Sequence, residues 1–158
     1  NRDGIKSLLL KKMEKMCNPG PIITVGGKEV GRHPGICFFT TGQRRGLYLT
    51  LGEPYYVVKI IPEKNAIVVG KKEDVLSRIL IAEKLLWAKG YKVEEGKTVE
   101  AKIRYRVKPA RARILYWDGE TLKLEFFEPQ WAITLGQVVV IYEGEKVVGG
   151  GWIKGSEK

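Results

Sequence analysis

The chain has 158 residues, of which 28 are Lys or Arg and 18 are Asp or Glu, so its formal net charge is +10 at pH 7. With 44% hydrophobic and 29% charged residues the composition is that of a folded protein, which excludes wholesale disorder, and no apolar run approaches the ~20 residues of a transmembrane helix. The charge predicts an anionic partner, although composition alone does not separate nucleic acid from a membrane surface or an acidic protein.

The first predicted element is an amphipathic helix near the N-terminus. Apolar residues recur there every three or four positions, with lysines at several of the positions between them. Asp3 is a candidate cap at the start, and Asn18-Pro19-Gly20 ends the pattern. Because Asp3 and Glu14 weaken a membrane anchor, we expect this helix to pack on a sheet. Its apolar positions are Ile5, Leu8, Leu9, Met13 and Met16.

Beyond this helix the chain is predicted to be mainly β. Its 19 glycines separate short β-branched and aromatic runs, a pattern typical of antiparallel sandwiches and barrels. Hairpin turns are predicted at 62–65, at Asp118-Gly119 and at 143–145. Residues 79–88 fit both a helix and a strand.

A polar break near residue 74 divides the β region. The run Lys71-Lys72-Glu73-Asp74 interrupts the apolar pattern, so we place a module boundary near 74–78. The predicted organisation is two small antiparallel β modules, at 19–77 and 78–158, which follow a helical linker segment at 1–18.

The most informative stretch of charge runs from Lys102 to Lys108. Its four basic residues alternate with three apolar ones, which on a strand would direct all four cations to one face. Arg111 and Arg113 extend the pattern, so that six cations and no acid lie between 102 and 117. Like charges on one face repel each other, and a phosphate backbone would relieve that repulsion and release counterions. We therefore predict an anion site on this strand, with a merely solvated strand as the alternative.

A second basic element is the glycine-bounded loop at 40–47. Its adjacent Arg44 and Arg45 would form phosphate contacts, and Gln43 would supply a hydrogen bond to a base or ribose. The alternative is a loop with two solvated arginines. Aromatic side chains would also stack on bases, although in β proteins they more often belong to the core. These aromatic residues are Tyr48, Tyr55, Tyr105, Tyr116 and Trp131.

Catalytic and metal-ligating constellations are scarce. Cys17, Cys37 and His33 supply three soft ligands, too few for a four-ligand zinc site. We expect two free thiols in a reducing compartment, in keeping with an N-terminus that lacks the order of a signal peptide. His33 and Cys37 allow a Cys–His nucleophile pair, but Pro34-Gly35 predicts a turn there. Residues 149–151 lack the ending of a phosphate loop, so their three glycines predict a bulge or a close strand crossing.

Four stretches occur in the order and spacing of motifs from one known family. They are His-Pro-Gly-Ile-Cys-Phe-Phe-Thr-Thr-Gly-Gln-Arg-Arg-Gly-Leu at 33–47, Lys-Ile-Arg-Tyr-Arg at 102–106, Phe-Glu-Pro-Gln-Trp-Ala-Ile-Thr-Leu-Gly-Gln at 127–137, and the segment at 144–153 with its Gly-Gly-Gly. Together they resemble the bacterial tRNA-specific 2-thiouridylases, and the resemblance covers about residues 19–153. One departure is Leu135, where the family usually has Pro, which questions the rigidity of that turn.

The resemblance implies a protein of three parts. In the family, an N-terminal ATP-pyrophosphatase domain adenylates the wobble uridine of certain tRNAs and holds two active-site cysteines. A small central β domain and a C-terminal translation-factor-like β-barrel follow, and this chain resembles those two parts. Cys37 lies in the His-x-Gly segment, so it does not match the second catalytic cysteine, and Cys17 matches neither. Because the chain begins with Asn1 rather than Met, we expect a piece of a longer protein.

The family's tRNA contacts, carried over by motif, fall on Arg104, Tyr105 and Gln137. Arg106 and Lys108 join them as expected phosphate contacts from the same basic stretch. The arginines of the 40–47 loop, Arg44 and Arg45, are second-tier candidates, because the motif there would equally serve the fold. No catalytic and no metal-ligating residue is predicted in this chain.

The expected function is to grip tRNA and to present its anticodon wobble uridine for ATP-dependent 2-thiolation by a catalytic domain outside this chain. ATP and Mg²⁺ would belong to that missing domain, and no cofactor is expected here. The expected partners are tRNA and a sulfur-donor protein in the cytoplasm, without membrane or DNA. Two alternatives remain: a stand-alone translation-factor-like barrel that binds ribosomal RNA or a protein, and a small cysteine enzyme that uses Cys37 and His33.

Overall fold

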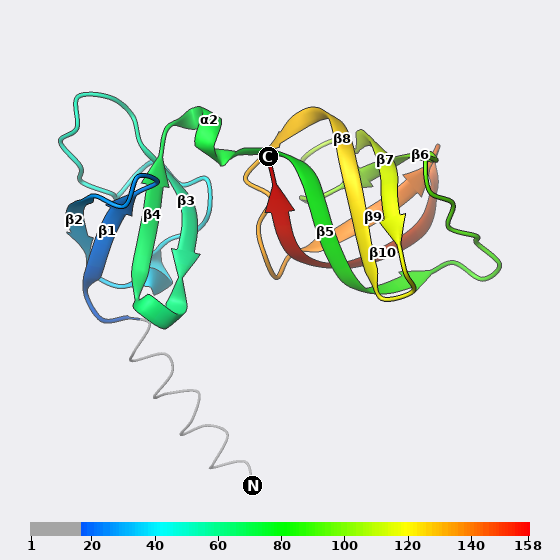
Figure 1. Cartoon of the computed structure of the whole chain (residues 1–158), viewed down its shortest axis with the longest axis horizontal. Coiled ribbons are helices and arrows are strands. Elements are labelled where there is room, and N and C mark those ends of the chain that lie inside the picture. The colour runs from blue at the N-terminus through cyan, green and yellow to red at the C-terminus, as the bar shows by residue number, and fades with distance from the viewer. Residues whose placement is uncertain (1–16) are drawn as a thin grey trace, which may run out of the picture. The chain divides into compact units, whose positions relative to one another are not determined.

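In the computed structural model, which describes residues 17–158, the described chain divides into two compact units, the first ending at Val75 and the second spanning Leu76–Lys158 (Figure 1). Both units are built mainly from strands, which confirms the predicted mainly-β class. The helix expected over 5–16 lies outside the described residues. None of the helices within 17–158 has the length and apolar character to cross a membrane.

The first unit contains a four-stranded sheet with the strand order β2-β1-β4-β3. Its strands are β1 (Gly20–Thr24), β2 (Glu29–His33), β3 (Tyr56–Ile61) and β4 (Ala66–Gly70). The hairpins β1–β2 and β3–β4 are antiparallel, but β1 and β4 run parallel, with Ile22 opposite Ile67. The prediction of an antiparallel module is therefore wrong for this sheet, which is mixed.

The connection at 34–55 explains the mixed sheet. It carries the chain back along the sheet after β2, so that β3 starts at the same end as β2 and β4 then runs alongside β1. The connection contains the short 3₁₀ helix η1 (Ile36–Phe38), and a second, η2 (Pro62–Lys64), makes the predicted turn between β3 and β4. Leu47 from the connection is buried with Val57 and Ile67 of the sheet, so part of this long loop belongs to the core.

A one-turn helix, α2 (Lys72–Val75), leads into the second unit, a closed six-stranded barrel with the strand order β10-β5-β8-β7-β6-β9. Every strand pair in this barrel is antiparallel. The ambiguous segment at 79–88 is strand as far as Trp87, and the predicted turns at Asp118-Gly119 and 143–145 join consecutive strands. The strands are β5 (Leu76–Trp87), β6 (Thr98–Lys102), β7 (Ala110–Trp117), β8 (Thr121–Trp131), β9 (Val138–Glu143) and β10 (Lys146–Glu157).

The barrel interior follows from the alternation of apolar residues along each strand. In β8, Leu122, Leu124 and Phe126 are fully buried, whereas the residues between them are only partly buried. Each such side chain stabilises the fold by about 1.5–3 kcal/mol relative to exposure. Neighbouring strands add further fully buried residues, among them Leu80, Ala112, Ile114, Val139 and Ile141.

The three glycines at 149–151 allow β10 to pack closely against β5. A Cβ atom at Gly149 would collide with the Trp87 ring, and one at Gly151 would lie 2.5 Å from Leu85 Cδ1. The register between β10 and β5 shifts between Gly150 and Trp152, as at a bulge. The predicted bulge with close strand approach is confirmed.

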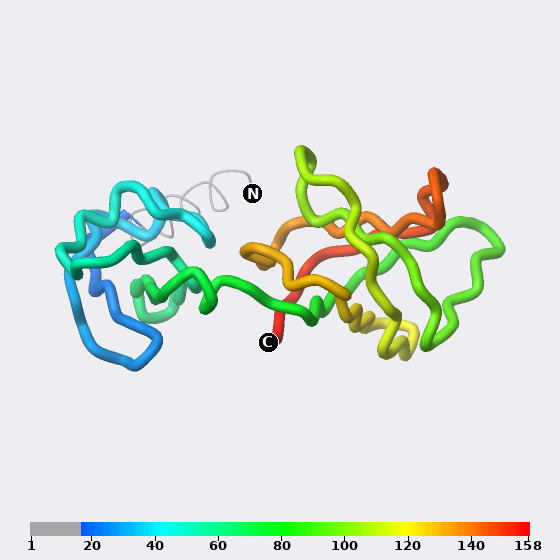
Figure 2. Tube along the Cα trace, turned by 90° about the horizontal axis from the view of Figure 1, so that it is seen from above, coloured from blue at the N-terminus to red at the C-terminus, as the bar shows by residue number. Residues whose placement is uncertain are grey.

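The antiparallel order places the connections of the barrel alternately at its two ends. The loop at 103–109 and the turn at 132–137 lie at one end, which we call the open end. The connections at 88–97, 118–120 and 144–145 lie at the other, which we call the closed end. Figure 2 traces both sets of connections from a second direction.

Candidate nucleic-acid interface

The basic stretch from Lys102 to Lys108 is a loop rather than the predicted strand. Strand β6 ends at Lys102, and the chain then turns, with the Val107 amide donating to the Arg104 carbonyl at 3.3 Å. The strand prediction is wrong because β7 starts only at Ala110, so the intervening residues have no partner strand on that side. An alternating sequence forms a strand only where a neighbour pairs with it.

Only one of the three apolar residues in this loop is buried. Ile103 is 5% exposed and joins the barrel core, whereas Tyr105 is 91% exposed and Val107 is also exposed. The exposed Arg106 and Lys108 have no ion-pair partner within residues 17–158. The Lys102 Nζ lies 5.6 Å from the centre of the Tyr105 ring. The loop therefore presents cations together with an exposed aromatic ring, on a turn instead of a flat sheet face.

Arg104 joins this loop to the turn at 132–137. Its Nη2 donates a hydrogen bond to the Ala132 carbonyl at 2.7 Å, and the Thr134 hydroxyl donates to the same oxygen at 2.9 Å. Ala132 is buried and has a φ of 49°, a left-handed conformation that directs its carbonyl away from the regular ladder. One nitrogen of the Arg104 guanidinium is thus used in a hydrogen bond within the protein, whereas the sequence pattern predicts this side chain as a phosphate contact.

Gln137 lies on the second loop of the open end. The Ile153 amide donates to its carbonyl at 2.7 Å, and the Gly136 amide donates to the Ile153 carbonyl at 2.9 Å, so β10 holds the turn despite Leu135. The Gln137 side chain is exposed, and it makes no hydrogen bond within the described part of the chain. Through Arg104, the structure brings the Tyr105 loop and the Gln137 turn together. Charge and periodicity carry no signal for Gln137, which only the family motif indicated.

The period-two prediction is correct on β7. Arg111 and Arg113 are exposed, and Ala112 between them is fully buried. Both guanidinium groups lie over the Phe127 ring, at 5.2 and 5.7 Å from its centre. The face is less uniformly basic than predicted, because Glu100 stands opposite Arg111 in the neighbouring strand. These two arginines cover an aromatic side chain of the barrel wall in addition to carrying charge.

The Arg44–Arg45 loop belongs to the first unit. The Gln43 side chain closes it, accepting from the Thr40 amide at 3.1 Å and donating to the Arg45 carbonyl at 2.9 Å. The Gln43 side chain therefore makes its hydrogen bonds within the loop, whereas the sequence pattern predicts that it binds a base or ribose. Arg44 and Arg45 are exposed, and neither has a partner among the residues that the structure describes.

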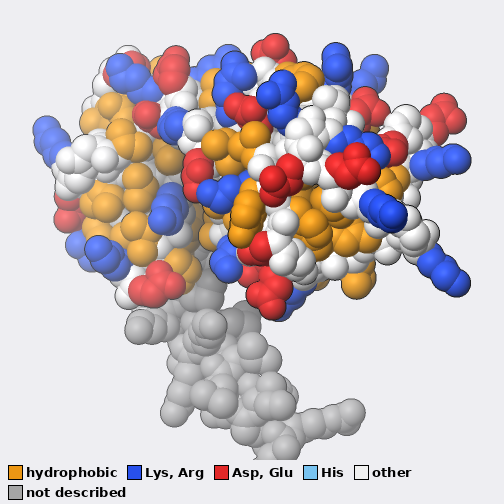
Figure 3. Space-filling view, turned by 45° about the vertical axis from the view of Figure 1, so that its right-hand side comes forward, with side chains coloured by type: hydrophobic (Ala, Val, Ile, Leu, Met, Phe, Trp, Pro, Cys, Tyr) orange, Lys and Arg blue, Asp and Glu red, His pale blue; other side chains and the backbone are white. Residues whose placement is uncertain are grey.

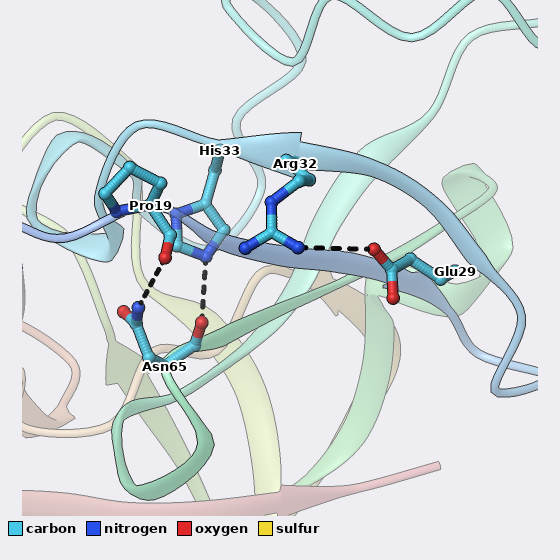
Figure 4. A network of polar contacts seen from close by, with 5 residues as sticks. All are labelled: Pro19, Glu29, Arg32, His33 and Asn65. Atoms are coloured by element: carbon cyan, nitrogen blue, oxygen red, sulfur yellow. Dashed lines mark hydrogen bonds and ion pairs between the residues drawn. The ribbon is translucent and has the colours of Figure 1, made fainter.

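His33 is a structural residue of the first unit, as Figure 4 shows. It is 1% exposed, and its Nε2 lies 3.0 Å from the Asn65 carbonyl oxygen, so Nε2 is the atom that carries the hydrogen. Burial lowers the pKa of His33, which favours the neutral ring. Asn65 has a left-handed φ of 47° and donates from Nδ2 to the carbonyls of Asn18 and Pro19. The hydrogen bond from the His33 ring thus holds the β3–β4 turn against the end of β2.

Cys17 and Cys37 form a disulfide with a Cα–Cα distance of 5.5 Å, so the prediction of free thiols is wrong. The two segments meet closely because position 35 has no side chain: a Cβ at Gly35 would lie 2.7 Å from Cys17 Cα. This contact joins residues 20 apart in sequence, which local patterns do not reveal. Because Cys37 is in a disulfide and the His33 ring is hydrogen-bonded to Asn65, the Cys–His nucleophile pair is not formed. No cluster of three or more metal-ligating side chains occurs within residues 17–158.

The surplus positive charge does not form one continuous patch on the face seen in Figure 3. Lys and Arg side chains lie there among Asp, Glu and hydrophobic ones. Local groups of residues, such as the open-end loops and the Arg44–Arg45 loop, are therefore better candidates for a specific ligand than overall charge.

Comparison with known proteins identifies the family. A family model described as a tRNA methyl transferase PRC-barrel domain matches residues 6–71, and one described as an aminomethyltransferase beta-barrel domain matches residues 77–153. The tRNA-specific 2-thiouridylase MnmA of Moorella thermoacetica is 46% identical over 157 residues, and that of Halothermothrix orenii is 45% identical over 136. The chain belongs to the tRNA-specific 2-thiouridylase family.

The matches to these relatives cover 97% and 86% of this chain but only 42% and 38% of the relatives. The relative from Clostridioides difficile gives a similar result, with 42% identity over 92% of this chain and 40% of that protein. The chain therefore spans about two-fifths of the length of the curated relatives that it matches. The resemblance inferred from the four sequence stretches is confirmed.

Proposed function

We propose that this chain is the tRNA-binding region of a tRNA 2-thiouridylase. It would position the anticodon wobble uridine for ATP-dependent 2-thiolation by a catalytic domain outside this sequence. The observation that carries the proposal is the open end of the barrel, where Arg104 joins the loop that carries the exposed Tyr105 to the turn that carries the exposed Gln137. The names of the relatives add that members of the family act on tRNA.

Each open-end side chain has a distinct task in this proposal. Arg106 and Lys108 neutralise phosphates, with release of counterions. Tyr105 offers a ring face to a base, a contact that contributes about 1–3 kcal/mol in other RNA-binding proteins. The Gln137 amide both donates and accepts hydrogen bonds, so it can read a base edge or a ribose. Arg104 holds the two loops together through Nη2, and the other nitrogens of its guanidinium donate to the RNA.

The remaining partners follow from the whole protein's chemistry. ATP and Mg²⁺ would bind the catalytic domain, and a persulfide-carrying protein would supply the sulfur. The reaction would take place in the cytoplasm. In this proposal, none of these groups would bind a residue of this chain.

The test is the salt dependence of tRNA binding by this chain. In Arg106→Ala/Lys108→Ala, the slope of log K against log salt concentration should fall by roughly one to two units, because two phosphate contacts are lost. The matched control is Lys89→Ala/Lys92→Ala, which removes the same charge from exposed positions at the closed end. The control should keep the original slope. Equal losses in both variants would mean that binding follows net charge and would refute the proposal.

A further inference from the structure

Tyr48 in the 34–55 connection is 95% exposed, more than any other large hydrophobic residue in the described part of the chain. The residues on both sides of it face inward: Leu47 is 5% exposed, and Leu49 packs against the same core. Gly31 makes room for Leu49, since a Cβ there would lie 2.9 Å from Leu49 Cδ2. With both neighbours fastened to the core, the Tyr48 side chain is directed into solvent.

The backbone of Tyr48 is also unusual. Its φ is 51°, in the left-handed region that disfavours every residue with a Cβ and that glycine adopts freely. The ring makes no hydrogen bond and no ring contact within residues 17–158. The first unit thus holds a large aromatic residue in a costly conformation without using its ring for folding. Strained residues of this kind are often found at ligand-binding sites.

An open pocket of about 470 Å³ lies beside this ring. Tyr48, Pro54 and Tyr55 give it apolar walls, and Arg44 supplies a cation. Glu53, also in the lining, is paired with Lys71 at 3.0 Å, so its negative charge is compensated. The Gln43 hydrogen bonds described above keep the arginine segment in place next to the pocket. The site therefore combines an exposed aromatic ring, a recess and the Arg44 guanidinium group, with Arg45 next to Arg44 in the chain.

We propose that Tyr48 and this pocket bind one unpaired nucleotide of RNA. The base stacks on the Tyr48 ring, and the flanking phosphate pairs with Arg44 or Arg45. Stacking on an aromatic side chain beside a cationic contact is the way in which single-stranded RNA is held without a sequence code. The inference rests on the proposed function, because it adds a second RNA contact, on the first unit, to the contacts at the open end of the barrel.

The experiment measures the affinity of the full chain for tRNA and for a fully paired RNA duplex. Tyr48→Ala should weaken tRNA binding by about 5- to 150-fold and leave the salt slope unchanged, because stacking releases no counterions. Tyr48→Phe keeps the ring and should bind within about twofold of the original chain. Tyr48→Gly should bind as weakly as Tyr48→Ala while raising the melting temperature, because it removes the backbone strain. Duplex binding should be the same in all three variants.

Three results would overturn the inference: unchanged tRNA binding in Tyr48→Ala, equal weakening in Tyr48→Phe, or an equal loss on the duplex. The comparison variant Tyr105→Ala separates this failure from that of the proposed function. If Tyr105→Ala weakens tRNA binding and Tyr48→Ala does not, the open end binds tRNA and the Tyr48 site does not. If the unaltered chain binds the duplex and tRNA with equal affinity and equal salt slope, its binding is not specific for tRNA, and the proposed function itself is refuted.

Discussion

The two ends of the barrel use aromatic residues in opposite ways. At the closed end, Trp87 stacks on Tyr91 with ring centres 5.4 Å apart and meets Trp117 edge-on at 5.5 Å. At the open end, Tyr105 is 91% exposed, and the Lys102 ammonium group lies 5.6 Å from the centre of its ring. Rings that pack together stabilise the fold, whereas a ring left in solvent is available to a ligand.

Charged groups show the same contrast. At the closed end, Glu143 accepts from the Tyr91 hydroxyl at 2.6 Å and pairs with Lys97 Nζ at 2.6 Å. Burial, and then the hydrogen bond to Glu143, raise the pKa of Tyr91 to about 12, so its hydroxyl remains a donor at neutral pH. The open-end cations Arg106 and Lys108 have no such partner among residues 17–158. The Tyr91–Glu143–Lys97 group at the closed end is therefore paired within the chain, whereas Arg106 and Lys108 at the open end are not.

The largest expected effect breaks the closed end. Trp87→Ala removes both ring contacts and the surface on which Gly149 packs, so the free energy of unfolding of the second unit should fall by about 3 kcal/mol. Denaturant titration followed by circular dichroism measures this. The matched control is Trp152→Ala, because Trp152 is 49% exposed on the outer wall and should cost less than about 1 kcal/mol. An equal fall in the free energy of unfolding in the two variants would contradict the prediction that the packed rings of Trp87, Tyr91 and Trp117 stabilise the closed end.

A smaller effect is expected at the open end. Arg104→Ala leaves the buried Ala132 carbonyl with Thr134 as its remaining side-chain donor, and a charged hydrogen bond of this kind contributes about 1.5–3 kcal/mol. Stability should therefore fall by about 1.5 kcal/mol, and tRNA binding should weaken because the Tyr105 loop and the Gln137 turn separate.

Arg104→Lys distinguishes positioning from charge. Lysine keeps the charge but lacks the fork of donors, so it should fail to restore the contact between the loops. In the original chain, Tyr105→Ala and Gln137→Ala should show coupled effects on tRNA affinity in a double-mutant cycle, and the coupling should disappear in Arg104→Lys. Full rescue by lysine would show that Arg104 acts only as a phosphate contact.

Much of the barrel could be predicted because its signals are local. Alternation of apolar residues marks β8, and Asp118-Gly119 marks the turn before it. There the Asp118 carboxylate accepts from the amides of Glu120 and Thr121 at 2.8 and 2.7 Å, and Gly119 has a φ of 98°. Both contacts lie within three residues of Asp118, so the sequence pattern contains them.

Most of the errors concern contacts between residues far apart in the chain. The basic stretch has a strand's alternation, but Pro109 precedes β7 and the residues after Lys102 find no partner strand. The Cys17–Cys37 disulfide and the parallel pairing of β1 with β4 likewise depend on where separate segments meet. The Arg104–Ala132 hydrogen bond spans 28 positions, which is why the link between the two open-end loops was not predicted.

The smallest expected effect concerns the response of the closed end to acid. The hydrogen bond from Lys97, followed by that from Tyr91, lowers the pKa of Glu143 from its ordinary value of 4.5. A carboxyl group with a lowered pKa stabilises the fold above its unfolded value, and this contribution is lost as the pH falls below about 4.5 through the folded value.

Glu143→Gln should therefore destabilise the second unit at pH 7 and flatten the decline of its stability below pH 4.5. Because the Glu143 and Lys97 side chains are about one-third exposed, screening by solvent limits the difference to about 1 kcal/mol or less. Glu100→Gln is the control, since the Glu100 side chain makes no ion pair or hydrogen bond within residues 17–158. Thermal melts between pH 3 and pH 7 measure both variants. If they give the same pH profile, the ion pair does not distinguish the closed end from the rest of the barrel, and the contrast between the two ends rests on the aromatic rings alone.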